Sequence, residues 1–101
     1  MNKRPKRRVL FALGQTYATP AALEVLDVAQ ISPVLLLAEH QAGIWGDLDA
    51  EDKAANERAV RTGARILSVR KIGKARLYII TEAENDAGLR SATTILLCSE
   101  Y

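Results

Sequence analysis

Ala64-Arg65-Ile66-Leu67-Ser68-Val69-Arg70 is the first of three β-rich stretches in the last third of the chain, and Arg76-Leu77-Tyr78-Ile79-Ile80-Thr81-Glu82 and Ser91-Ala92-Thr93-Thr94-Ile95-Leu96-Leu97 follow it. Their aliphatic and β-branched residues predict three strands, over Arg65–Arg70, Arg76–Thr81 and Ala92–Cys98. Lys71-Ile72-Gly73-Lys74 is predicted to form a turn between the first two, because Gly73 can adopt a positive φ. The short connections favour an antiparallel meander.

Three helix-start signals precede this sheet. Thr19-Pro20, Ser32-Pro33 and Asp49 each combine a capping side chain with a following helical pattern. They predict helices over Pro20–Ala29, Pro33 to about Ala42, and Ala50–Thr62. The last of these has few apolar residues and is expected to pack on the surface through small side chains.

The fold class is therefore predicted to be α+β. A short N-terminal strand at Val9–Leu13 precedes the two to three helices, and the three-stranded meander packs on those helices. The predicted core contains eleven residues: Leu10, Leu23, Leu26, Leu35, Leu36, Trp45, Leu67, Leu77, Ile79, Ile95 and Leu97. Residues 9–101 are expected to form a single domain.

Charge is distributed unevenly along the chain. Residues 1–8 hold five cations and leave nine Lys and Arg against 12 Asp and Glu in the remainder. This segment is predicted to be a flexible basic arm, which either contacts nucleic-acid phosphates or only aids solubility. The arm's cations are Lys3, Arg4, Lys6, Arg7 and Arg8.

The composition also limits where in the cell the protein is expected and which cofactors it could bind. The single cysteine, Cys98, cannot form an internal disulfide, which is typical of a reducing compartment. No apolar run reaches the roughly 18 residues of a membrane span, and no secretory pattern follows the basic start. A cytoplasmic protein without membrane contact is expected. The sequence contains no metal-ligand spacing, phosphate loop or dinucleotide fingerprint, so no metal or cofactor is predicted.

Several strings resemble a family of small bacterial proteins carried on plasmids, integrative elements and phages. The most specific is His40-Gln41-Ala42-Gly43-Ile44-Trp45-Gly46-Asp47-Leu48; others are Ala18-Thr19-Pro20-Ala21-Ala22-Leu23, Gly63-Ala64-Arg65-Ile66-Leu67-Ser68 and Thr93-Thr94-Ile95-Leu96-Leu97. Members are labelled plasmid-related or hypothetical, and some are labelled type I restriction endonuclease subunit M. The chain departs from the family in its longer Glu82–Ser91 loop and in Cys98-Ser99, where a proline is common.

The resemblance implies a mobile-element accessory protein. A methyltransferase subunit is not expected, because the chain has neither an adenosylmethionine-binding domain nor an Asn/Asp-Pro-Pro-aromatic motif. The leading hypothesis is a non-enzymatic protein-interaction module that acts on host defence complexes, of restriction or CRISPR type, or on replication machinery. Its partner would be a host or element-encoded protein complex, and the oligomeric state is open. The candidate binding residues are His40, Trp45, Asp47, Glu82 and Arg90.

Two of these residues have structural alternatives. His40 could act as a base, or it could interact with the carbonyls at the end of its helix or hydrogen-bond the following turn. Trp45 could stack on a nucleic-acid base or could fill the junction between helix and sheet. Asp47 and Asp49 are interpreted as turn and cap residues, and Asn56 is expected to make a tertiary hydrogen bond.

Two alternative functions remain open. One is a metal-independent ribonuclease of the barnase, EndoU, colicin or RelE-like type, an analogy at the level of fold. Its residues would be His40, Arg65, Arg76, Thr81, Thr94 and Tyr101. The other is nucleic-acid binding through the basic arm.

Overall fold

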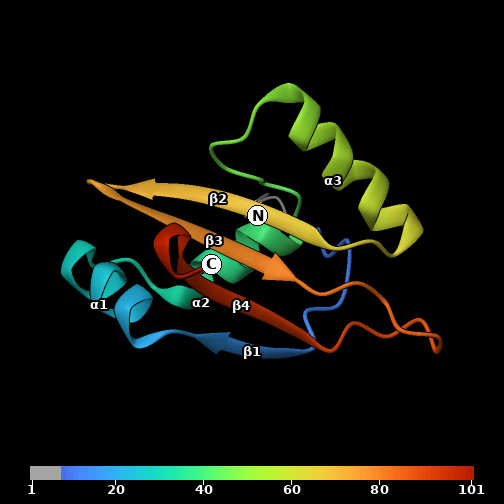
Figure 1. Cartoon of the computed structure of the whole chain (residues 1–101), viewed down its shortest axis with the longest axis horizontal. Helices are drawn as coiled ribbons and strands as arrows, with labels where there is room; N and C mark the ends of the chain where they lie inside the picture. The colour runs from blue at the N-terminus through green and yellow to red at the C-terminus, as the bar shows by residue number, and fades with distance from the viewer. Residues whose placement is uncertain (1–7) are drawn as a thin grey trace, which may run out of the picture.

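The computed structural model describes residues 8–101 and confirms the α+β class (Figure 1). Its elements, in chain order, are β1 (Gln15–Ala18), α1 (Pro20–Ala29), α2 (Pro33–Gln41), α3 (Ala50–Thr62), β2 (Ile66–Ile72), β3 (Ala75–Thr81), β4 (Ala92–Leu97) and the 3-10 turn η1 (Cys98–Glu100). The predicted basic arm, apart from Arg8, lies outside the described residues.

All three helices begin where their capping signals predict. The Thr19 hydroxyl accepts a hydrogen bond from the Ala22 amide, and Ser32 accepts one from the Val34 amide. The Asp49 carboxylate accepts the Asp52 amide at 2.8 Å. Each cap pairs an amide that the first helical turn would otherwise leave unsatisfied.

The four strands form one sheet in the order β1-β4-β3-β2. The predicted antiparallel meander is confirmed, with Ile66 opposite Thr81 and Ile79 opposite Ile95. β1 adds a parallel strand to β4, with Tyr17 opposite Thr94. The sheet therefore has four strands and is mixed.

The strand predicted at Val9–Leu13 is wrong, because β1 begins at Gln15. Three of residues 9–13 pack against the core. Phe11 is buried and Leu10 and Leu13 pack beside it, and the Leu10 amide donates to the Gln41 carbonyl at the end of α2. Gly14 then turns the chain into β1 at a φ of 67°. A Cβ there would lie 2.4 Å from the Arg90 carbonyl oxygen, which explains the glycine.

Helices α1 and α2 cover one face of the sheet, and the register defines that face. Alternation places Ser68, Ile79 and Ile95 on it, and these residues are buried. Its apolar core comprises Ala22, Leu26, Leu36, Leu77, Ile79 and Ile95. A second cluster joins Phe11, Trp45, Ala59 and Ile66.

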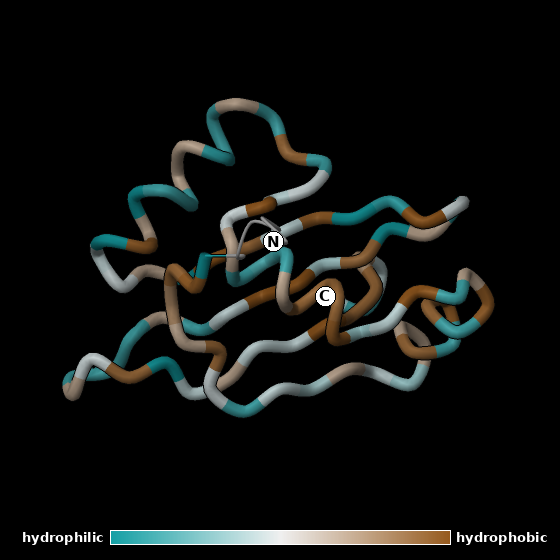
Figure 2. The backbone as a smooth tube through the Cα atoms, turned by 180° about the vertical axis from the view of Figure 1, so that it is seen from behind, coloured by the Kyte–Doolittle hydropathy of each residue, from teal (hydrophilic) through white to brown (hydrophobic). Residues whose placement is uncertain are grey.

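Helix α3 lies beyond the β2 edge (Figure 1) and is mostly hydrophilic along its length (Figure 2). It buries only Asn56 and Ala59, as expected for packing through small side chains. Asn56 makes the expected tertiary hydrogen bonds. Its side chain donates to the Leu67 carbonyl at 2.7 Å and accepts the Leu67 amide at 3.2 Å.

The predicted core is partly wrong. Leu23 and Leu35 are 43% and 41% exposed, because α1 and α2 turn other positions to the sheet, spaced four residues apart: Ala22 with Leu26, and Leu36 with His40. Three more predicted core residues are only half-buried, Leu10, Leu67 and Leu97. Burial is confirmed for Leu26, Leu36, Trp45, Leu77, Ile79 and Ile95.

Among the described residues, no single helix has the length and apolar character needed to cross a membrane; only α1 and α2 taken together pass that test, and they meet at a bend of 101°.

Candidate functional site

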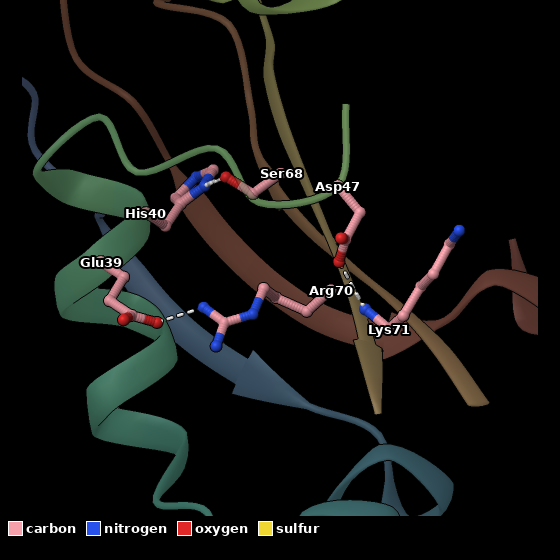
Figure 3. Close-up of polar contacts among 6 residues, drawn as sticks. All are labelled: Glu39, His40, Asp47, Ser68, Arg70 and Lys71. Atoms are coloured by element: carbon pink, nitrogen blue, oxygen red, sulfur yellow. Dashed lines mark hydrogen bonds and ion pairs between the residues drawn. The ribbon is translucent and has the colours of Figure 1, made fainter. Parts of the chain in front are cut away.

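A chain of polar side chains runs through the core beneath α2. His40 Nδ1 lies 2.5 Å from the Ser68 hydroxyl oxygen on β2 (Figure 3), and Nε2 lies 2.9 Å from the Thr81 hydroxyl oxygen on β3. The Thr81 and Thr93 hydroxyl oxygens are 2.6 Å apart. Thr93 in turn donates to the Leu13 carbonyl at 2.7 Å. The chain thus links α2, three strands and the segment before β1.

The hydrogen atoms in this chain have only one arrangement. Thr93 uses its single hydroxyl hydrogen on the Leu13 carbonyl, so Thr81 must donate to Thr93. Thr81 has no second hydrogen, so His40 must donate from Nε2 to Thr81. A neutral imidazole then leaves Nδ1 as the acceptor, and Ser68 donates to it.

Burial, and secondarily the positive charge of Arg90, lower the pKa of His40 from 6.5 to about 3. The imidazole is therefore neutral at physiological pH, and in that form Nδ1 accepts the hydrogen of Ser68. Phe11 and Trp45 both lie edge-on to the ring, with centroids at 5.2 and 6.0 Å. The suggested contact of the His40 ring with the carbonyls at the end of α2 is not made, because the side chain extends from the buried face of that helix.

The string His40–Asp47 joins the end of α2 to the outer edge of β2. Trp45 is 4% exposed and fills the predicted junction between helix and sheet. Gly46 has a φ of 78°, and a Cβ there would lie 2.0 Å from the Val69 carbonyl oxygen. Asp47 accepts the Lys71 amide (Figure 3) and donates its own amide to the Val69 carbonyl.

The outer edge of β2 is consequently protected from pairing with another strand. Asn56 satisfies the backbone of Leu67, and the Trp45 carbonyl and Asp47 amide satisfy that of Val69. The string that carries the family resemblance thus has a structural explanation in this chain. It supplies a buried histidine, a buried tryptophan and a backbone bridge to the sheet.

Arg90 and Glu82 lie at the end of the sheet near α3. The Arg90 guanidinium is buried and donates to three carbonyls, those of Ala59, Ala64 and Glu82. It also lies over the Phe11 ring, 5.6 Å from the centroid. These contacts join α3 to the loop after β3, which makes Arg90 a structural residue. The Glu82 side chain is exposed.

The six residues of the ribonuclease hypothesis are divided between the two faces of the sheet. His40 and Thr81 lie on the helix-covered face, where His40 is 1% exposed and both ring nitrogens are occupied. Arg76, Thr94, Arg65 and Tyr101 belong to the opposite side, by register or by contact with Tyr78. The six do not converge on one cleft, and His40 cannot reach an RNA hydroxyl in this fold.

All three tyrosines of the chain lie on that opposite face. Tyr17 on β1 is opposite Thr94 on β4, and Thr94 is opposite Ile80, which shares a face with Tyr78. Tyr101 lies edge-on to Tyr78, with ring centroids 5.7 Å apart. Tyr17 and Tyr101 are 57% and 65% exposed. The other two aromatic residues, Phe11 and Trp45, are buried around His40.

Turn η1 carries Tyr101 back across this face (Figure 1). The Glu100 carboxylate accepts the Leu97 amide at 2.8 Å and the Thr19 hydroxyl at 2.7 Å, and these bonds lower the pKa of Glu100. The anchored turn positions Tyr101 between Tyr78 and Arg65. The Arg65 guanidinium lies 5.4 Å from the Tyr101 ring centroid.

Three exposed cations belong to the same face: Arg65, Lys71 and Arg76. Glu82 and Glu100 lie at its two ends. Within the described residues, the one ion pair is between Arg70 and Glu39 on the helix-covered side (Figure 3). We call Tyr17, Tyr78, Tyr101, Arg65, Arg76 and Lys71 the tyrosine–arginine face. Arg8, the one described residue of the basic arm, is exposed.

Comparison with family models, with curated proteins and with solved structures found no match to this chain. No group of three His, Cys, Asp or Glu residues within 8–101 could hold a metal ion.

Sequence analysis missed Tyr17 and Tyr78. Arg76 and Tyr78 are two residues apart in a predicted strand, and this spacing could have shown that both lie on one face of the sheet. Tyr17 had no such signal, because its strand pairs with a segment far along the chain.

Proposed function

We propose that this protein is a non-enzymatic accessory protein that binds single-stranded nucleic acid through the tyrosine–arginine face. One observation carries the proposal: every tyrosine of the chain lies on the sheet face opposite α1 and α2, together with three exposed cations. Large aromatic residues normally contribute to a core, and here Phe11 and Trp45 do so.

The chemistry of this face suits unpaired bases. Aromatic rings stack on any base, and each such contact contributes about 1–3 kcal/mol to binding. Tyr17 and Tyr101 present exposed rings for stacking. Arg65 and Arg76 can pair with the phosphates that link the stacked bases.

A single strand fits this surface better than a duplex does. Reading a duplex takes an element that enters a groove, such as a protruding helix or a two-stranded ribbon. The tyrosine–arginine face is instead a sheet surface crossed by the short turn η1. Unpaired bases can lie flat on such a sheet, with their rings against tyrosines. The basic arm would add phosphate contacts that do not depend on sequence.

Our second proposal is that the protein binds a protein partner, which would be a host defence or replication complex. The observation that favours it is the set of exposed apolar residues on α1 and α2: Leu23, Val28, Val34 and Leu35. A partner that covered these side chains would remove apolar surface from water. The proposed mobile-element role rests on the resemblance of the His40–Asp47 string.

Fluorescence anisotropy with labelled poly-dT and poly-U oligonucleotides tests the proposed function. Tyr17→Ala and Tyr101→Ala should each weaken binding by about thirtyfold, which corresponds to the middle of the range for one lost stacking contact. Leu89→Ala is the matched control, because Leu89 is 64% exposed but lies on the loop after β3. Wild-type affinity should fall as salt concentration rises.

A variant that lacks residues 1–7 separates the face from the arm. It should bind more weakly with a smaller salt dependence, and should still lose affinity when Tyr101 is replaced. Equal affinity of the wild type and both tyrosine variants, with binding abolished by removal of the arm, would overturn the role of the face.

A further inference from the structure

The two edges of the sheet differ in how they are covered. At the β2 edge, Asn56 and residues 45–47 bond to the strand backbone. β1 is the strand at the other end of the order β1-β4-β3-β2, and in Figure 1 no helix or strand lies along its outer side. One edge is thus protected from strand pairing, and the other is open to it.

The backbone of β1 turns two residues outward. The amides of Gln15 and Thr19 both donate to carbonyls on the β4 side, at 3.0 Å. Successive residues of a strand direct their backbone groups to opposite edges, so Thr16 and Ala18 direct theirs away from β4. Within residues 8–101, no backbone group from a loop or cap bonds to either of them. Two amides and two carbonyls are therefore left for a further strand.

β1 lacks the features that usually block pairing at an edge, which are charged side chains, prolines and bulges. Its four residues, Gln15–Ala18, are all neutral, and they pair with β4 without a bulge. Gln15, Thr16 and Tyr17 are exposed. Because the strand is short, the partner that suits it best is one that satisfies every outward group.

A second copy of β1 does so when the two strands run antiparallel about a two-fold axis at Tyr17. Thr16 of each copy then lies opposite Ala18 of the other, and each of these two pairs exchanges two hydrogen bonds. Tyr17 faces its own symmetry mate in the closer, non-hydrogen-bonded type of pair. An aromatic pair in this position adds to the stability of the pairing. No like charges meet, because Gln15 lies opposite Thr19.

No other register of two β1 strands is as complete. A shift of two residues in one direction sets Ala18 against Gly14, which has a φ of 67° and is not extended. A shift in the other direction sets Thr16 against Pro20, which has no amide hydrogen and begins α1. The edge of β1 is thus complementary to itself about Tyr17 alone, as a two-fold interface requires.

We infer that the β1 edges of two copies pair antiparallel about Tyr17 and form a homodimer with one continuous sheet. The axis is perpendicular to the sheet, so both tyrosine–arginine faces lie on the same side. The two Tyr17 rings join them into one surface. A single strand that crosses from one copy to the other rests on the proposed function, whereas the dimer does not.

Sedimentation equilibrium of the full chain without nucleic acid, from low micromolar to near-millimolar concentration, measures the dimer. The wild type should dimerise. Thr16→Pro removes an outward amide hydrogen and should be a monomer with an unchanged circular dichroism spectrum, because an edge strand tolerates proline where the amide faces solvent. The matched control Thr16→Val keeps the amide and should dimerise. A monomeric wild type, or a dimer that persists in Thr16→Pro, would overturn the inference.

Disulfide cross-linking tests the register in a Cys98→Ser background, which removes the single thiol of the chain. Tyr17→Cys should form a covalent dimer under oxidised glutathione, because Cα atoms about 4.5 Å apart can be bridged. Gln15→Cys is the control on the same face. Its two copies stand four residues apart along the strands, roughly 13 Å, which is too far for a disulfide. Equal cross-linking of the two variants, or none in Tyr17→Cys, would contradict the register.

The dimer and the proposed function fail separately in these measurements. A monomeric wild type that binds poly-dT would overturn only the dimer. A dimer that binds no oligonucleotide would overturn only the proposed function.

Discussion

Ser68 on β2 donates its only hydroxyl hydrogen to Nδ1 of His40 on α2, across 2.5 Å of the buried core. This contact resembles the pairing of a nucleophilic serine with its base. Both side chains are enclosed, however, with exposed fractions of 2% and 1%. The pair begins a chain of hydrogen bonds that ends on the Leu13 carbonyl. In this protein the contact stabilises the fold and fixes the tautomer of the histidine.

Replacement of His40 should therefore destabilise the protein. His40→Leu leaves the Ser68 hydroxyl without its acceptor in the core, and an unsatisfied buried group costs about 1–3 kcal/mol. We expect a loss of about that size in the free energy of unfolding, measured with urea. Ser68→Ala should cost less in the His40→Leu background than in the wild type. Additive costs would mean that the two residues are not coupled.

The same histidine should make stability depend on pH. Its pKa is about 3 in the folded protein and 6.5 is the ordinary value, so the unfolded chain binds more protons between these two pH values. Stability is then complete above pH 6.5, and it falls as the pH drops from 6.5 toward 3. The slope from this one group approaches about 1.4 kcal/mol per pH unit.

Urea unfolding between neutral pH and about pH 5 measures this slope while most carboxylates stay ionised. His40→Leu removes the only histidine of the chain and should flatten the profile in this range. An equally steep profile in the variant would show that other groups cause the pH dependence.

Asn56 protects the outer edge of β2 and supplies a test of the α3 contact. Its side chain forms two hydrogen bonds with the backbone of Leu67. Asn56→Ala should reduce stability by about 1–3 kcal/mol and should accelerate hydrogen exchange at the Leu67 amide. Asn56→Asp should be no more stable than Asn56→Ala, because it sets a carboxylate against the Leu67 carbonyl. Unchanged exchange at Leu67 in both variants would contradict the contact.

The position of the core can be tested with one pair of residues. Ile79 is 1% exposed and Leu35 is 41% exposed. Ile79→Ala should lower the free energy of unfolding by about 2–5 kcal/mol, because it leaves a cavity in the core. Leu35→Ala should cost well under half of that. Equal losses would show that α2 packs with a different face.

The sequence predicted the elements with local signals and missed those that depend on distant contacts. Thr19, Ser32 and Asp49 marked the helix starts because capping involves only the next three residues. β1 was missed because it pairs in parallel with β4, which follows all three helices in the sequence. Residues 9–13 looked like a strand because apolar residues that pack against a core can resemble a buried strand.

In the candidate site, too, the residues with local signals were predicted and those that depend on distant contacts were not. Trp45 has the structural one of the two roles considered for it, and Asn56 makes the tertiary hydrogen bond that was expected. The burial of His40 was not predicted, although its spacing of four from Leu36 places both on one helix face. The tyrosine–arginine face could not be derived without β1, since Tyr17 joins it only through the register with Thr94.

The most direct test of the proposed binding face is an NMR titration of ¹⁵N-labelled full-length protein with an unlabelled poly-dT oligonucleotide. Amide shifts should change at Tyr17, Tyr78 and Thr94 and at the Arg65 side chain, while the amides of α1 and α2 stay in place. Shifts confined to α1 and α2 or to the basic arm, or no shifts at saturating oligonucleotide, would contradict the account.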